Sequence, residues 1–169
     1  IIKRIPNNIR RLLILGNVLI ECEYPETMIE LKIKTLNDIK INKLQEKLEK
    51  LHIEEVFNQE LDFLPESLKE MTIFGKFNKK IDNLPKKIER LCIVGDFNQN
   101  IDNLPNTIVA LVIQSKLDKV INKFPKSLQV LSLGNYSVNE TIKIPESVTH
   151  MMIGNKSEQL YNYENKAIN

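Results

Sequence analysis

The sequence predicts a repeat solenoid, a right-handed coil with one parallel β-sheet and a mostly extended, helix-poor convex side. Three observations predict this fold. Proline recurs every 20 residues from Pro65 to Pro145. Each of these prolines follows an apolar residue, and a second apolar residue lies three positions after it. A pair of apolar residues two positions apart comes next, as in Leu91 and Ile93. Self-similarity at such a period is typical of stacked repeats.

Each part of the repeat has a physical reason. The apolar pair predicts a short strand with both side chains on one face, because side chains alternate along a strand. Proline cannot lie inside a sheet ladder, so it belongs on the convex arc. Twenty residues leave too little chain for a full helix on that arc, although one helical turn fits at Pro-x-x-Leu. Stacked coils bury their apolar sets against each other. We expect eight such repeats over residues 1–155 and a polar cap or tail over residues 156–169.

Two further columns recur with the same period. Gly75 and Gly95 follow the predicted strand, where the chain must turn and glycine tolerates a positive φ. An asparagine follows a phenylalanine at Phe57, Phe77 and Phe97. We expect the phenylalanines to stack as a core spine and the asparagines to bond the backbone of neighbouring coils. The third repeat lacks the proline, and its residues 44–51 allow a short amphipathic helix.

The combination Leu-Pro-x-Ser-Leu with Phe-Asn-x-x-Ile resembles the FNIP repeat, a leucine-rich-repeat relative found in amoebae and giant viruses. Residues 64–81 and 84–101 carry the match, and residues 104–121 carry it more loosely, with Leu117-Asp118 in place of Phe-Asn. The resemblance implies a leucine-rich-repeat-like coil. In that family the repeats often follow an F-box, which docks to a ubiquitin-ligase adaptor. Nothing in this sequence looks like an F-box, so such a role would lie upstream of Ile1.

Composition and chemistry argue against several classes of function. The chain is 42% hydrophobic and 27% charged with a net charge of +2, which is typical of a folded protein without a nucleic-acid or membrane partner. Cys22 and Cys92 stand far apart, which favours a reduced, cytoplasmic location, the host cytoplasm if the source is viral. His52 and His150 lie five coils apart and are expected to be solvated. Adjacent carboxylates such as Glu54-Glu55 should point apart on a strand. We therefore expect no metal, no cofactor and no enzymatic activity.

The exposed face of the sheet remains as the place for function. From the fourth repeat onward its outward positions turn apolar or small, which favours a protein-binding surface. Phe74 is expected to be a large exposed aromatic, Arg90 its neighbouring anchor and Cys92 a mildly accessible thiol. The alternative is a structural or assembly element with no ligand on this face, since strands favour β-branched residues in any case. The predicted partner-binding residues are Thr72, Phe74, Arg90, Cys92, Val94, Val112 and Gln114.

The two ends differ. The polar stretch over residues 156–169 contains Leu160, Tyr161 and Tyr163 and is expected to cap the last coil. The first repeat begins without a capping element and is more apolar than an exposed first coil should be. We interpret this as a sign of further sequence upstream.

Overall fold

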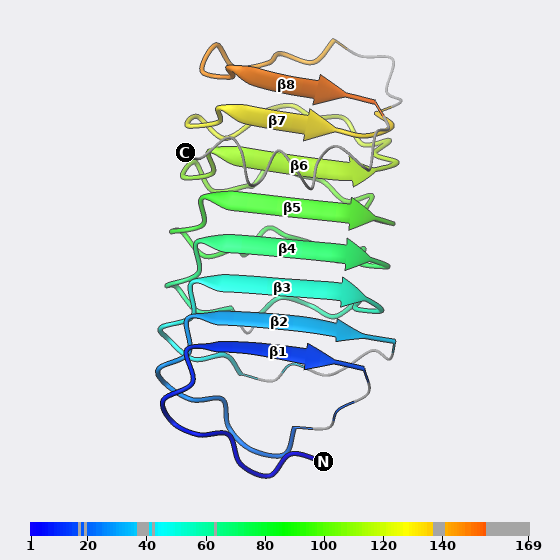
Figure 1. The fold of residues 1–169 in the computed structure, drawn as a ribbon. Coiled ribbons are helices and arrows are strands. Elements are labelled where there is room, and N and C mark those ends of the chain that lie inside the picture. Colours follow the sequence, from blue (N-terminus) through cyan, green and yellow to red (C-terminus); the bar gives the residue numbers. More distant parts are fainter. Residues whose placement is uncertain are drawn as a thin grey trace.

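The computed structural model describes residues 1–16, 18, 20–36, 41, 43–62, 64–136 and 141–154. Its eight strands form one parallel sheet in the order β1 to β8, so each coil adds one strand beside the last (Figure 1). Within these ranges the chain forms no helix. The predicted solenoid with an extended convex side is thereby confirmed. The strands are β1 (Arg11–Leu15), β2 (Glu30–Thr35), β3 (Lys50–Glu55), β4 (Glu70–Gly75), β5 (Arg90–Gly95), β6 (Ala110–Ser115), β7 (Val130–Leu133) and β8 (His150–Ile153).

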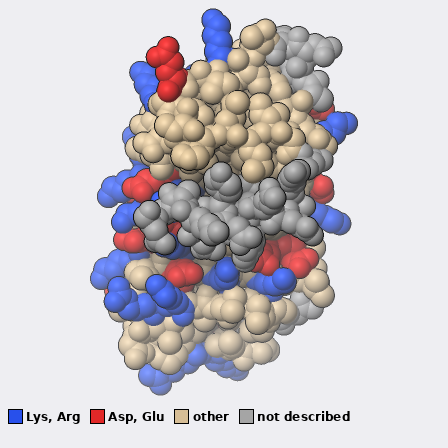
Figure 2. Space-filling view, turned by 45° about the horizontal axis from the view of Figure 1, so that its top comes forward, with Lys and Arg blue, Asp and Glu red and all other residues tan. Residues whose placement is uncertain are grey.

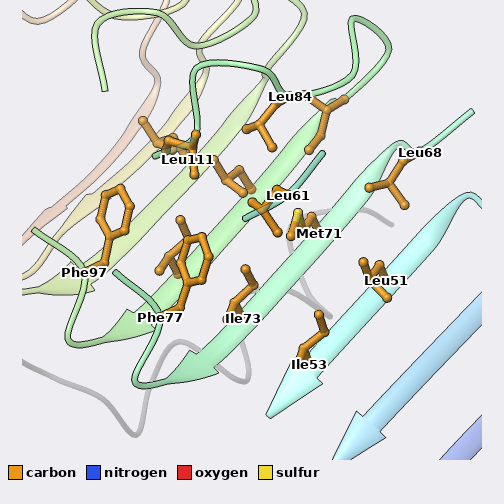
Figure 3. Close-up of a cluster of buried hydrophobic side chains, with 14 of the residues drawn as sticks. Leu51, Ile53, Leu61, Leu68, Met71, Ile73, Phe77, Leu84, Phe97 and Leu111 are labelled. Carbon is orange, nitrogen blue, oxygen red and sulfur yellow. The ribbon is translucent and has the colours of Figure 1, made fainter. Parts of the chain in front are cut away.

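The core lies between the sheet and the convex arc. In β2 to β7 the two apolar positions of each strand point inward and are at most 1% exposed. The strands pair without a register shift, so Leu51, Met71 and Leu91 follow one another in a single column. Figure 3 shows such columns side by side, with Ile53 and Ile73 lying along the next one. Burying a leucine or isoleucine contributes about 1.5–3 kcal/mol relative to exposure. The repeated apolar pair therefore contributes a large part of the stability of the fold.

A tight turn at the proline position ends each convex arc, just before the next strand. The amide of Leu68 donates to the carbonyl of Pro65 at 3.1 Å, and Ile88 does the same to Pro85. In the third repeat Leu48 donates to the carbonyl of Gln45 at 3.0 Å. The helix expected over residues 44–51 is therefore wrong. Glutamine adopts the same turn as proline here because the coils on either side fix the path of the backbone.

The phenylalanine spine and the asparagine ladder are both present. The rings of Phe57 and Phe77 stack with centroids 6.0 Å apart. Phe77 stacks on Phe97 in the same way at 6.1 Å, and both of these rings are labelled in Figure 3. One position further along, the Oδ1 of Asn58 accepts a hydrogen bond from the amide of Asn78 at 2.9 Å. Asn78 accepts from the amide of Asn98 at the same distance, and Asn98 accepts from that of Asp118 at 3.1 Å. Each of these three asparagines thus satisfies a turn amide of the next coil.

The residue that ends the strand adopts a positive φ in three successive coils. Gly75 has φ 112° and Gly95 has φ 132°, as predicted for glycine in a sharp turn. Glu55 holds the same position in β3 with φ 82°. This conformation ends the alternation of side chains, so Glu54 and Glu55 do not point apart. Their carboxylates lie 3.2 Å and 3.9 Å from the same ammonium group, that of Lys34.

The described part of the chain stops at Gly154. The predicted cap over residues 156–169 lies outside the described residues. Within them, no helix is long and apolar enough to cross a membrane.

Candidate functional site

The seven predicted binding residues lie together on the outer face of three adjacent strands. Thr72 of β4, Cys92 of β5 and Val112 of β6 stand opposite one another in register. Phe74, Val94 and Gln114 form the next row across the same strands, and Arg90 lies in the row that contains Glu70 and Ala110. The regular register makes this face contiguous, with one row every second residue.

The exposure of this face differs from the prediction. Thr72, Phe74, Arg90 and Val94 are half-buried, whereas Cys92, Val112 and Gln114 are only 7–8% exposed. The expectation of an accessible Cys92 thiol is therefore wrong. Neighbouring strands lie about 4.8 Å apart, so a short side chain flanked on both sides is shielded by its neighbours. Of the seven, the half-buried residues offer the surface that a partner can touch.

Phe74 is not the free aromatic that the sequence suggested. Its ring packs against the imidazole of His52, with centroids 5.7 Å apart and planes tilted by 37°. His52 is itself half-buried, so the prediction of a solvated side chain fails for it, while His150 is exposed. Burial lowers the pKa of His52, and the charge of Lys32 lowers it further, against the opposing effect of Glu54 and Glu30.

The Nε2 of His52 is buried and makes no hydrogen bond with any described residue. Its Nε2 lies 3.5 Å from Oε1 of Glu54, which is within ion-pair range, but the geometry makes no hydrogen bond. A neutral imidazole packed on an aromatic ring fits this environment better than an imidazolium. The His52–Phe74 contact therefore marks the border between the charged and the apolar parts of the outer face.

Ion pairs occupy the N-terminal half of this face. Lys34 pairs with Glu54 at 3.2 Å, and Lys50 pairs with Glu70 at 2.9 Å. Arg90 extends the second group, because its Nη1 lies 3.6 Å from the other carboxylate oxygen of Glu70. The predicted anchor Arg90 is thus held in place by the strand before it. Such partly exposed pairs are worth about 0–1 kcal/mol each, so they position side chains more than they stabilise the fold.

Sequence reasoning missed one member of the site. Ser132 of β7 is 2% exposed, and its hydroxyl lies 2.8 Å from the amide nitrogen of Gln114, which donates to it. This bond satisfies two buried polar groups on an otherwise apolar stretch. The signal in the sequence was a small polar residue in the column of Cys92 and Val112, which the period places beside Gln114.

The remaining reactive side chains do not gather. Cys22 is half-buried in a loop of the first coil and lies far in sequence from the buried Cys92. Across the described ranges, no group of three or more His, Cys, Asp or Glu side chains is placed to hold a metal ion.

Comparison with known proteins gives a likeness to a solved structure. No protein-family profile matches this chain, and no curated protein does. A solved structure, that of the circular LRR protein CroV588, superposes with a TM-score of 0.71 and is 28% identical in sequence. The likeness covers 89% of this chain but 24% of CroV588, so the chain spans about a quarter of that protein's length. The fold is therefore leucine-rich-repeat-like, and the finer assignment to FNIP repeats stays a prediction.

Proposed function

We propose that this chain is a non-enzymatic binding module that holds a protein partner on the outer face of β4, β5 and β6. Its leucine-rich-repeat-like fold is that of a protein-interaction repeat module. The observation that carries the choice of face is the contiguous apolar row of Phe74 and Val94, which adjoins Cys92 and Val112 across paired strands. On β2 and β3 the same rows hold lysine, histidine and glutamate.

The chemistry of the face suits a partner with an apolar anchor and a polar rim. A partner side chain over Phe74 and Val94 would bury apolar surface in the centre. The Glu70–Arg90 pair stands at one side and offers charged groups to the rim. Interfaces concentrate their binding energy in such central aromatic and arginine positions. Gln114 and Ser132 bond each other, so they would not need a partner's polar group.

A finer proposal concerns the pathway. We infer from the repeat resemblance alone that the module serves as the substrate-recognition part of an F-box-type ubiquitin-ligase component. An F-box encoded ahead of Ile1 in the full reading frame would support this role. A different domain at that place would contradict it without touching the binding face.

The face can be tested with matched surface variants. Tagged wild type, Phe74→Ala and Val94→Asp would be used to capture proteins from a cell extract, with quantitative mass spectrometry as the measurement. Lys126→Asp, on the exposed convex arc, is the control because it also changes charge but lies away from the sheet. We expect the two face variants to lose partners that wild type and the control retain, while circular dichroism shows that both variants remain folded. If both face variants keep every partner, the proposed face is wrong.

A further inference from the structure

A row of alternating charges crosses the outer face from β1 to β5. The parallel register places one charged residue of each strand opposite that of the next, and the sign changes at every step. The row consists of Arg11, Glu30, Lys50, Glu70 and Arg90. Figure 2 shows acidic and basic side chains close together over the N-terminal part of this face. Opposite charges on neighbouring strands favour each other, whereas like charges there are destabilising.

Ion pairs hold most of this row together. Nε of Arg11 lies 3.1 Å from a carboxylate oxygen of Glu30. The carboxylate of Glu70 stands between two cations, with Nζ of Lys50 at 2.9 Å and Nη1 of Arg90 at 3.6 Å. The alternation stops after Arg90, because the next strand, β6, has Ala110 opposite it. Arg90 is therefore a cation with an anion on one side and a methyl group on the other.

The guanidinium of Arg90 has donors to spare. This group carries five N–H donors in a planar fork. It approaches Glu70 at 3.6 Å and makes no hydrogen bond with any described residue. Its side chain is 35% exposed, so a partner can reach it. An anion placed above Ala110 would continue the alternation of charge and use the free donors.

We propose that the partner presents an aspartate or glutamate to Arg90, above Ala110, together with an apolar side chain above Phe74 and Val94. This inference rests on the proposed function and specifies the chemistry of the partner. Val94 lies four residues after Arg90 on the same face of β5, so the two groups are about 13 Å apart along the strand. An extended segment of the partner spans that distance with an acidic and an apolar residue four positions apart.

The surroundings of Arg90 favour a carboxylate over a phosphate group. The row holds three cations and two anions, so a single negative charge balances it. A phosphorylated side chain would bring a charge of about −1.5 to −2 close to the carboxylate of Glu70. A carboxylate also matches the planar fork of the guanidinium with two parallel hydrogen bonds. Arg90 is thus the residue that determines the preference for an acidic partner.

A phage-displayed library of random linear peptides tests the proposal. It would be selected in parallel on the immobilised full chain and on four variants, Arg90→Gln, Arg90→Lys, Phe74→Ala and Lys50→Gln, with circular dichroism to confirm that each is folded. We expect wild type to enrich peptides that carry an acidic residue four positions from an apolar one. Arg90→Gln should lose the acidic preference, and Arg90→Lys should keep part of it. Lys50→Gln is the control, since Lys50 has the same charge in the same row but is already paired with Glu70.

The affinity of one enriched peptide then measures the contact directly. Fluorescence anisotropy would compare this peptide with a counterpart in which the acidic residue is replaced by its amide. On wild type the amide peptide should bind about tenfold more weakly, because a hydrogen-bonded charge is lost. On Arg90→Gln the two peptides should bind alike. Added salt should reduce the difference on wild type, since it screens exposed charges.

The outcomes separate this inference from the proposed function. Enriched peptides that depend on Phe74 but show no acidic preference would overturn the inference and leave the binding face standing. An acidic preference that survives Arg90→Gln would also overturn it. If wild type enriches no peptide above the bare support, the proposed binding function is contradicted, and this inference with it.

Discussion

Replacing Gly75 with alanine should be among the most damaging single substitutions in this chain. Gly75 ends β4 with φ 112°, a value that lies outside the left-handed helical region open to some L-residues. A Cβ built on it would lie 1.9 Å from the carbonyl oxygen of Glu55 in the coil before. That oxygen is fixed because it accepts the amide of Lys76 at 3.3 Å. The clash is with backbone, so no side-chain rotation relieves it.

The cost follows from two contributions. The positive φ alone costs an alanine about 1–2 kcal/mol. Relieving the clash requires two packed coils to separate by more than an ångström, and overpacking of this kind costs about 1–3 kcal/mol. We therefore expect Gly75→Ala to lower the free energy of unfolding by about 4 kcal/mol. Gly16 is the matched control, since its φ is 70° and a Cβ there meets nothing within 4 Å. Gly16→Ala should cost about 1 kcal/mol.

Thermal and urea unfolding monitored by circular dichroism would measure both losses. In a domain of this size 1 kcal/mol shifts Tm by about 2–4 °C, so Gly75→Ala should melt about 10 °C lower than wild type and Gly16→Ala about 3 °C lower. Equal shifts for the two variants would refute the reasoning. They would mean that φ alone, and not the approach of adjacent coils, requires glycine.

Three more predictions concern the core, a strained residue and a titrating one. Phe77→Ala should cost about 3–5 kcal/mol in urea unfolding because it removes the middle ring of the buried spine, whereas Phe74→Ala on the outer face should cost under about half as much. Glu55→Gly should raise the free energy of unfolding by about 1 kcal/mol, since φ 82° strains a residue with a side chain; Glu55→Ala keeps the strain and should give no such gain. Burial lowers the pKa of His52, so as the pH falls below about 6.5 the unfolded chain takes up the proton first and stability falls. His52→Gln should flatten that part of the stability profile, and an unchanged profile would contradict the assignment.

Much of the architecture could be predicted because the period constrains every coil in the same way. Once a coil is about 20 residues long and stacks without a register shift, residues one period apart must be neighbours. The stacking of Phe57, Phe77 and Phe97 and the ladder from Asn58 to Asn98 follow from that condition. The helix expected at residues 44–51 failed for the same reason. The neighbouring coils decide the path of the arc, and local helix propensity does not override them.

The candidate site was predictable in position but not in accessibility. The outward rows of β4 to β6 follow from the alternation of side chains along each strand. The period did not indicate that Phe74 packs against His52 or that Arg90 pairs with Glu70. It also did not indicate that Cys92 is shielded from solvent. These contacts depend on which rotamers fill the space between strands. Several side chains of different sizes compete for that space.

The sequence alone therefore determined the repeat, the strand register and the identity of the two faces, because periodicity converts spacing along the chain into adjacency in space. Only the tertiary structure decided which outward residues a partner can reach, since exposure depends on the side chains of adjacent coils. It also decided that Cys92 and Val112 are shielded on the outer face, because the flanking strands of adjacent coils cover them.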